Sequence, residues 1–282
     1  MAKSIPIAEL ARVAHPRDSK RRIMALLTAY FDASSTEANS RSPGRVTSLG
    51  GYIGADGTWS KVEKEWAANL TLWGLERFHL TRILAGRTES GAANANPDLC
   101  ALSFAKIIKR SDLHSIHAGL RADEWDAAPK TQEQLARHPR HYHCCLDMLL
   151  EILAEHCQLE FPHDDVAVVL DRDEQPGPQF HFILDDWKAR NPKFITIDPG
   201  DRKRFPILQT ADLCAGEQRI AWLAREFPDK PEFHAFSRRY LAAIGRRGRG
   251  IFWSVQTQKM IAEAQARVRA EPERRGRREE EG

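Results

Sequence analysis

The sequence predicts an α/β domain in which a mixed five-stranded sheet is flanked by helices. One observation is a pair of short runs, residues 26–32 and 166–171, that are apolar almost throughout, as strands buried on both faces are. A second observation is that longer segments between the expected strands carry apolar residues at helical spacing. A third is the order of these segments along the chain, in which helices separate the later strands and make parallel pairing possible.

Three further strands complete the expected sheet. The stretch "RVTSLGGYIGADG" gives the second strand, where the pair Gly50 and Gly51 indicates a bulge or a close backbone approach. The third strand is "DLHSIHAGL", because Ile116, Ala118 and Leu120 alternate with other residues. The fifth is "KFITID", which ends at Asp198.

The expected helices have apolar stripes or capping signals. In the segment "SKVEKEWAANLTLWGL", Val62, Trp66, Leu70 and Trp73 share one face. The other expected helices are "DLCALSFAKIIKR", the segment through "HCCLDMLLEILAEH", residues 179–190, residues 206–227 and residues 252–268.

These elements suggest a division of the chain into a core domain and appendages. The expected parts are a basic N-terminal segment at 1–24, the α/β domain at 25–228 with a helical insertion at about 58–109, a C-terminal helical extension at 229–268, and a charged disordered tail at 269–282.

Composition favours a globular protein of the cytoplasm. The 282 residues are 42% hydrophobic and 29% charged, with a net charge of +3. Five cysteines without framework spacing suit a reducing compartment, and no apolar run is long enough to span a membrane. Arginines are concentrated within residues 12–22 and again within 238–249. The sequence is compatible either with contact between these clusters and nucleic acid or with an ordinary solvated surface.

Three of the expected strands end in an aspartate, at Asp32, Asp171 and Asp198. The carboxyl ends of parallel strands lie along one edge of an open α/β sheet, which is where ligands bind. Carboxylates held close together repel unless a cation or shared proton compensates, and an all-oxygen group suits Mg²⁺ or Mn²⁺. Each aspartate alone could equally be a turn residue or a helix cap.

A fourth acid, Asp212, lies near the start of an expected helix in "FPILQTADLCAGEQRIAW". Its neighbours are small or apolar, and Gly216, Arg219 and Leu223 share its face. A carboxylate in that setting is expected to face the sheet. The structural alternative is compensation of the helix dipole in the first turn.

The motifs "YFDASSTE", "LGGYIGADGTWSKVEKEW", "FHLT", "VVLDRDE" and "LQTADLCAGEQR" together resemble the domain-of-unknown-function family numbered 3800 (DUF3800). The resemblance covers about residues 26–226 in the family's order. That family is similar to the ribonuclease H-like superfamily, whose core runs as three strands, helix, strand, helix, strand, helix. The resemblance therefore implies this fold, with the helical insertion between the second and third strands.

The resemblance also implies a site. Asp32, Asp171 and Asp212 match the family's acids and would hold two Mg²⁺ or Mn²⁺ ions, while His79 and Glu217 would move protons or orient a water.

Ser34, Asp198 and Gln209 lie beside or among these acids and would support them, or merely cap local structure. Two positions depart from the pattern. Ala33 stands where many relatives have Glu, and the helix that carries a glutamate in ribonuclease H enzymes offers Asp147 or Glu151 here.

The expected function is a divalent-metal-dependent nuclease that contacts nucleic acid of undetermined type. The alternative is an inactive ribonuclease H-like module that binds nucleic acid or a protein. Two other patterns are weaker. "HPRHYHCC" lacks the ligand spacing of a zinc site, and the Asp-x-Asp of "VVLDRDE" lies too far along the chain for a haloacid-dehalogenase-type phosphatase.

Overall fold

The structure is a computed structural model of the whole chain. It describes residues 26–35, 45–171, 178–196, 206–227, 229 and 248–253. The N-terminal segment, the C-terminal tail, most of the expected C-terminal extension and Asp198 lie outside the described residues.

Strands and helices alternate along most of the described chain. The strands are β1 (Leu26–Ser35), β2 (Val46–Ala55), β3 (His114–Arg121), β4 (Asp165–Leu170), β5 (Phe194–Thr196) and β6 (Gly248–Trp253). The helices between β2 and β3 are α2 (Asp56–Trp73), α3 (Leu80–Leu84), α4 (Gly91–Ala95) and α5 (Pro97–Arg110). The remaining helices are α6 (Ala122–Ala127), α7 (Gln132–Arg137), α8 (His141–Glu160), α9 (Pro178–Arg190) and α10 (Leu208–Glu226).

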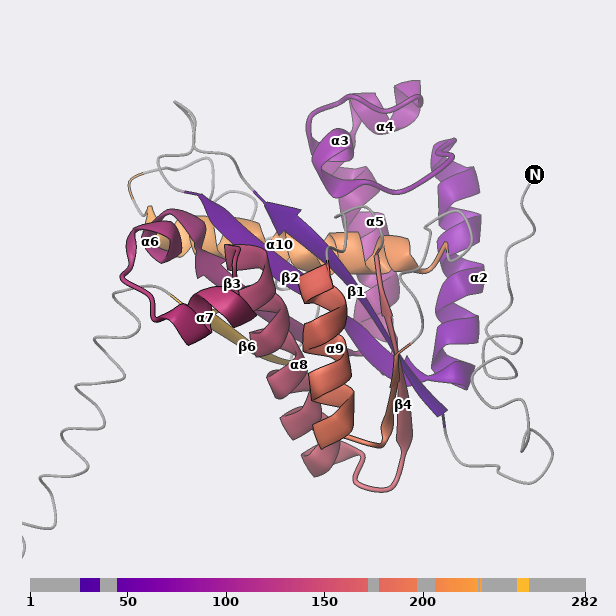
Figure 1. Ribbon diagram of the computed structural model, residues 1–282. Helices are drawn as coiled ribbons and strands as arrows, with labels where there is room; N and C mark the ends of the chain where they lie inside the picture. Colours follow the sequence, from indigo (N-terminus) through magenta and orange to yellow (C-terminus); the bar gives the residue numbers. More distant parts are fainter. Residues whose placement is uncertain are drawn as a thin grey trace, which may run out of the picture.

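The sheet is mixed, with the strand order β5-β4-β1-β2-β3-β6. Strand β2 is antiparallel to both β1 and β3, whereas β1 and β4, β4 and β5, and β3 and β6 are parallel. The expected α/β, ribonuclease H-like fold is confirmed, including the helical insertion between β2 and β3 (Figure 1).

The described sheet has a sixth strand that the sequence did not suggest. Strand β6 pairs with β3 along the edge of the sheet, with Trp253 opposite Leu120. Residues 252 and 253 were expected to begin a helix, and the structure corrects this, because both belong to β6.

Two helical layers cover the two faces of the sheet. Helices α8 and α9 lie in front of the sheet in Figure 1, and α10 lies behind it. Alternation along the strands assigns side chains to these layers, since Phe31 and Leu170 pack in the core under α8 and α9. Tyr30 and Val169 instead pack with α10 and the insertion. Residues 32 and 171, one step further on each strand, therefore lie on the α10 face.

Helix α10 packs directly on the middle of the sheet because glycines leave room for it. A Cβ atom at Gly50 would meet the backbone nitrogen and the Cα of Ala215 at 3.2 and 3.3 Å, which is tighter than ordinary contact. The Ser48 hydroxyl donates to the carbonyl of Ala215 at 2.6 Å in the same region. Further along the helix, the ring of Trp222 occupies the space above Gly119 on β3. The helix thus crosses β2 and then β3.

The insertion is fastened to the sheet by its own aromatic core. Trp66, Phe78 and Phe104 lie within 5.1 Å of one another, measured between ring centroids. The indole N–H of Trp59 donates to the carbonyl of Thr28 on β1 at 2.8 Å. This packing holds the segment that leads into α3 against α10.

Candidate functional site at the carboxylate edge

Asp32 and Asp171 lie side by side at the carboxyl ends of two neighbouring parallel strands. Phe31 pairs with Leu170, and the backbone N–H of Asp171 donates to the carbonyl of Phe31 at 2.9 Å, so the register brings the two aspartates together. Neighbouring strands are about 4.8 Å apart, and residues in register share a face. Both aspartates are almost fully buried, at 5% and 9% exposure. Two carboxylates at that spacing repel each other unless a positive charge or proton offsets them.

Helix α10 brings Asp212 to the same face of the sheet and fixes it to the insertion. One carboxylate oxygen of Asp212, Oδ2, accepts the backbone N–H of Leu80 at 2.7 Å. One helical turn earlier, the side-chain oxygen of Gln209 accepts the N–H of Phe78 at 2.6 Å. Residues three apart on a helix lie on one side, and N–H groups two apart on an extended chain also do. The spacing of the Gln209 and Asp212 side chains along α10 therefore matches the spacing of the two N–H groups, of Phe78 and Leu80, that they accept.

His79 lies in the chain between the two residues that make these hydrogen bonds, Phe78 and Leu80. Its Nδ1 atom is 3.6 Å from Oδ2 of Asp212, and the side chain is about one third exposed. The docking of Phe78 and Leu80 thus positions the imidazole beside the carboxylate, at the boundary with solvent. A histidine in this place can take up or release a proton next to the acids.

Arg219 also belongs to this region. It lies seven residues after Asp212, about 20° away around the helix, so the two side chains leave α10 on the same side. Its Nη1 donates to the carbonyl of Ser35 at 3.1 Å, and its Nη2 to the hydroxyl of Thr81 at 3.5 Å. The sequence had shown that Arg219 shares the face of Asp212, but no role followed from that spacing alone.

Glu217, the other acid of α10, is not brought together with Asp212. The two are five residues apart, about 140° around the helix. Glu217 has no exposed surface, and neither of its carboxylate oxygens has a hydrogen-bond partner among the residues that the structure describes. Burial raises its pKa to about 9, and its interaction with Tyr52 also raises the pKa of that phenol, which burial already elevates. Glu217 is therefore a neutral acid near pH 7, on the side of α10 that faces Tyr52.

Asp147 and Glu151 are engaged elsewhere. Both belong to α8, which packs against the opposite face of the sheet. Asp147 accepts two hydrogen bonds from the guanidinium of Arg137 and contacts His138, and Glu151 pairs with Arg190 at 2.7 Å. Burial opposes the ionisation of Asp147, but these hydrogen bonds outweigh it and hold its pKa far below the usual value.

The oxygen donors at the carboxylate edge suit a hard divalent cation. Asp32, Asp171 and Asp212 offer only carboxylates, the ligand type that Mg²⁺ and Mn²⁺ prefer. Within the described part of the chain, however, no three His, Cys, Asp or Glu side chains are grouped closely enough to hold one ion together. As they stand, the described side chains at this edge do not form a three-ligand metal site. Ser34, on the same face of β1 as Asp32, is partly exposed beside them.

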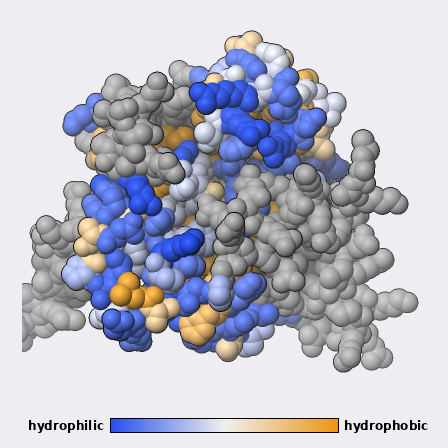
Figure 2. All heavy atoms as spheres, turned by 45° about the horizontal axis from the view of Figure 1, so that its top comes forward, coloured by the Kyte–Doolittle hydropathy of each residue, from blue (hydrophilic) through white to orange (hydrophobic). Residues whose placement is uncertain are grey.

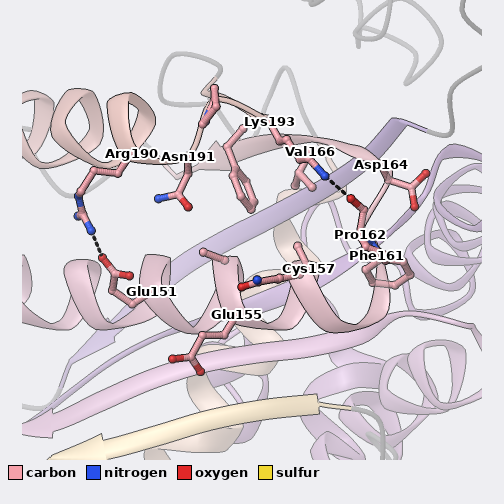
Figure 3. Close-up of a pocket in the computed structure, with 14 residues that line it drawn as sticks. Glu151, Glu155, Cys157, Phe161, Pro162, Asp164, Val166, Arg190, Asn191 and Lys193 are labelled. Atoms are coloured by element: carbon pink, nitrogen blue, oxygen red, sulfur yellow. Dashed lines mark hydrogen bonds and ion pairs between the residues drawn. The ribbon is translucent and has the colours of Figure 1, made fainter.

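A hollow lies elsewhere, at the opposite end of β4. This cavity of about 600 Å³ is lined by the carboxyl-terminal parts of α8 and α9 and by Val166 near the start of β4 (Figure 3). Its wall includes Cys157 and Phe161, and the Glu151–Arg190 ion pair lies at its side. Because Asp171 ends β4 at the other end, the cavity is separate from the acids.

On the face shown in Figure 2, the described surface is largely hydrophilic, with apolar residues scattered among polar ones. The most exposed large apolar side chains are Leu72 of α2 and Leu159 of α8. None of the helices in the described ranges combines the length and apolar character needed to cross a bilayer.

Comparisons with known proteins add little to this picture. No protein-family model matches the chain, and no curated protein matches it. Among solved structures, the chain is similar to a crystal structure of a mutant of Bst-RNase HIII, with 10% identity and a TM-score of 0.33. The match covers 79% of this chain and 71% of that one. We assign the fold from the strand order and strand directions rather than from this likeness.

Proposed function

We propose that the protein is a divalent-metal-dependent nuclease that hydrolyses phosphodiester bonds at the carboxylate edge. The observation that carries this proposal is the register of β1 and β4, which places Asp32 and Asp171 side by side and buried on the face covered by α10. Two buried neighbouring carboxylates cost stability unless a cation offsets their repulsion. The resemblance to family 3800 of domains of unknown function supports the same assignment.

In this proposal Asp32, Asp171 and Asp212 would hold Mg²⁺ or Mn²⁺ after rotating toward one another. When bound, such ions polarise a phosphodiester and make water nucleophilic. Asp212 would keep its hydrogen bond from the N–H of Leu80, which fixes one oxygen and orients the carboxylate. His79, beside Asp212 and reached by solvent, would accept or supply a proton during the cleavage.

The alternative is a ribonuclease H-like module that binds nucleic acid or a protein without cutting. Two features favour it. Ala33 follows Asp32 where a further carboxylate would be expected, and the carboxylate of Asp212 already serves as the acceptor that docks Leu80.

Cleavage assays separate the two functions. We expect the purified protein with Mn²⁺ or Mg²⁺ to cut at least one oligonucleotide in a panel of single-stranded, duplex and hybrid DNA and RNA. Asp171→Asn should abolish cutting, because it removes a charged ligand and keeps the size of the side chain. Asp185→Asn is the matched control, since Asp185 is exposed on α9. A protein that binds oligonucleotides but cuts none of them with either metal contradicts the nuclease assignment.

A further inference from the structure

Arg219 carries a positive charge into the candidate site without a matching acid. In the described part of the chain, no carboxylate oxygen lies within 4.0 Å of its guanidinium, and its two hydrogen bonds go to the uncharged oxygens of Ser35 and Thr81. Its Nε is enclosed and has no partner among the described residues. A partly buried guanidinium without an acid at contact distance is costly, and such charges are normally paired.

Burial and the charge of Asp212 both affect the pKa of Arg219. Burial lowers the pKa of the guanidinium, and the charge of Asp212 opposes that shift. The side chain stays cationic because arginine does not lose its proton in proteins. Asp212 thus acts on Arg219 at a distance without neutralising it by contact, and the charge remains available to a ligand.

The donors of Arg219 are only partly used. A guanidinium has five N–H groups, and the two hydrogen bonds to Ser35 and Thr81 leave one N–H on each terminal nitrogen. Paired terminal N–H groups match two oxygens of one phosphate, a fit that lysine cannot reproduce. Ser35 lies three residues after Asp32 on β1, so the guanidinium is held at the end of the strand that presents Asp32.

We propose that Arg219 is a substrate-positioning residue that binds a backbone phosphate of a nucleic acid beside the carboxylate edge. This inference rests on the proposed function for the identity of the ligand, but it does not require that cleavage occurs. Arg219 would bind the nucleic-acid backbone through its charge and its paired N–H groups, without contacting the bases that define the sequence. The competing role is purely structural, in which Arg219 only ties the end of β1 to α3.

Binding measured without divalent metal tests this role separately from cleavage. The probes are fluorescent single-stranded, duplex and hybrid oligonucleotides, titrated in EDTA at several salt concentrations and followed by anisotropy. Arg219→Gln should weaken binding about tenfold or more and reduce the slope of log affinity against log salt by about one, the signature of one lost phosphate contact. Arg225→Gln is the matched control, because Arg225 is exposed on the same helix and its replacement removes the same charge.

Arg219→Lys distinguishes a phosphate contact from an anchor. It keeps the charge and loses the paired donors, so we expect the salt slope of the wild type with intermediate affinity. Thermal melting of each variant shows whether a loss of binding reflects a loss of folding. If Arg219→Gln is destabilised, the binding of Arg219→Lys decides between the two roles.

Equal binding by the wild type, Arg219→Gln and Arg225→Gln overturns the inference, as does a wild type that binds no oligonucleotide in the panel. An Arg219→Lys variant that melts like the wild type and binds as tightly also overturns the paired contact. If Arg219→Gln binds weakly as expected but the wild type cuts nothing with Mg²⁺ or Mn²⁺, the nuclease proposal fails and the role of Arg219 stands.

Discussion

The two sides of α10 each carry an acid, and the two acids have different surroundings. Asp212 accepts a hydrogen bond from the N–H of Leu80, interacts with the charge of Arg219 and lies beside a partly exposed histidine. Glu217 is fully buried against Tyr52, and neither of its oxygens has a partner among the described residues. Both belong to the motif "ADLCAGEQR", so the difference comes from what the fold packs on each side.

The comparison shows that burial alone does not mark an active acid. Asp212 is nearly as buried as Glu217, at 6% and 0% exposure, but its surroundings contain a donor, a cation and a route to solvent. Those features stabilise a carboxylate, whereas a purely desolvating site stabilises the neutral acid. We therefore place the proposed chemistry on the Asp212 side and assign Glu217 no step in it.

Among the variants that compare the two sides of α10, Asp212→Asn should have the largest effect. Asp212→Asn keeps an oxygen that can accept the N–H of Leu80, so stability should change little. Cleavage should fall by more than about 100-fold, because losing a proposed metal ligand should cost more than the roughly 10- to 100-fold that losing a partner of a ligand costs. Initial rates on the best-cut oligonucleotide measure this, with Glu217→Gln as the control on the other side of the helix. Loss of activity in both variants to the same degree contradicts the distinction between the two sides.

The pH dependence of stability probes the Glu217 side. An unfolded chain releases this proton near pH 4.5, whereas the folded protein keeps it up to about pH 9. The folded state therefore binds more protons in that window, and this group lowers stability progressively as pH rises from about 4.5 to 9. Glu217→Gln removes the loss, since a glutamine stays neutral, and each unit of displaced pKa corresponds to about 1.4 kcal/mol.

Urea denaturation at pH 6 and pH 9 measures that difference. We expect the wild type to lose more stability between the two values than Glu217→Gln. Glu155→Gln is the matched control, because Glu155 is exposed on α8, and it should behave like the wild type. Parallel pH profiles for the wild type and Glu217→Gln show that Glu217 is ionised in the folded protein and contradict the contrast with Asp212.

The part of the site that the sequence predicts is the part fixed by local periodicity. The apolar runs that end in Asp32 and Asp171 identify parallel strands, and their shared edge follows from the fold class. Helical spacing likewise places Arg219 on the face of Asp212. Each of these relations involves a single element or one pair of elements, so it can be predicted from the local sequence.

What the sequence does not predict depends on distant packing. A glutamate in a helix with an arginine nearby is typical of a surface, but Glu217 is fully buried and interacts electrostatically with Tyr52. Strand β6 is short and begins with Gly-Arg-Gly, and it becomes a strand by pairing with β3, more than a hundred residues earlier in the chain. The insertion docks through backbone N–H groups, which have no sequence signature beyond the spacing of Gln209 and Asp212.

The smallest effect is expected for Gln209→Ala, which tests the docking of the insertion without changing the charge of Asp212. Gln209→Ala removes the acceptor of the buried N–H of Phe78, and an unsatisfied buried donor costs about 1–3 kcal/mol. Stability in urea should fall within that range, and the Phe78 amide should exchange faster with solvent by nuclear magnetic resonance. Cleavage should change little, because Leu80 keeps its bond to Asp212.

Gln218→Ala is the matched control for this variant, since Gln218 lies on the same helix and is only partly buried. We expect it to leave both the urea midpoint and the exchange of the Phe78 amide unchanged. If Gln209→Ala instead lowers cleavage as much as Asp212→Asn does, the two hydrogen bonds work as one unit. The position of the docked segment, rather than the charge of Asp212, would then be what separates the active side of α10 from the silent one.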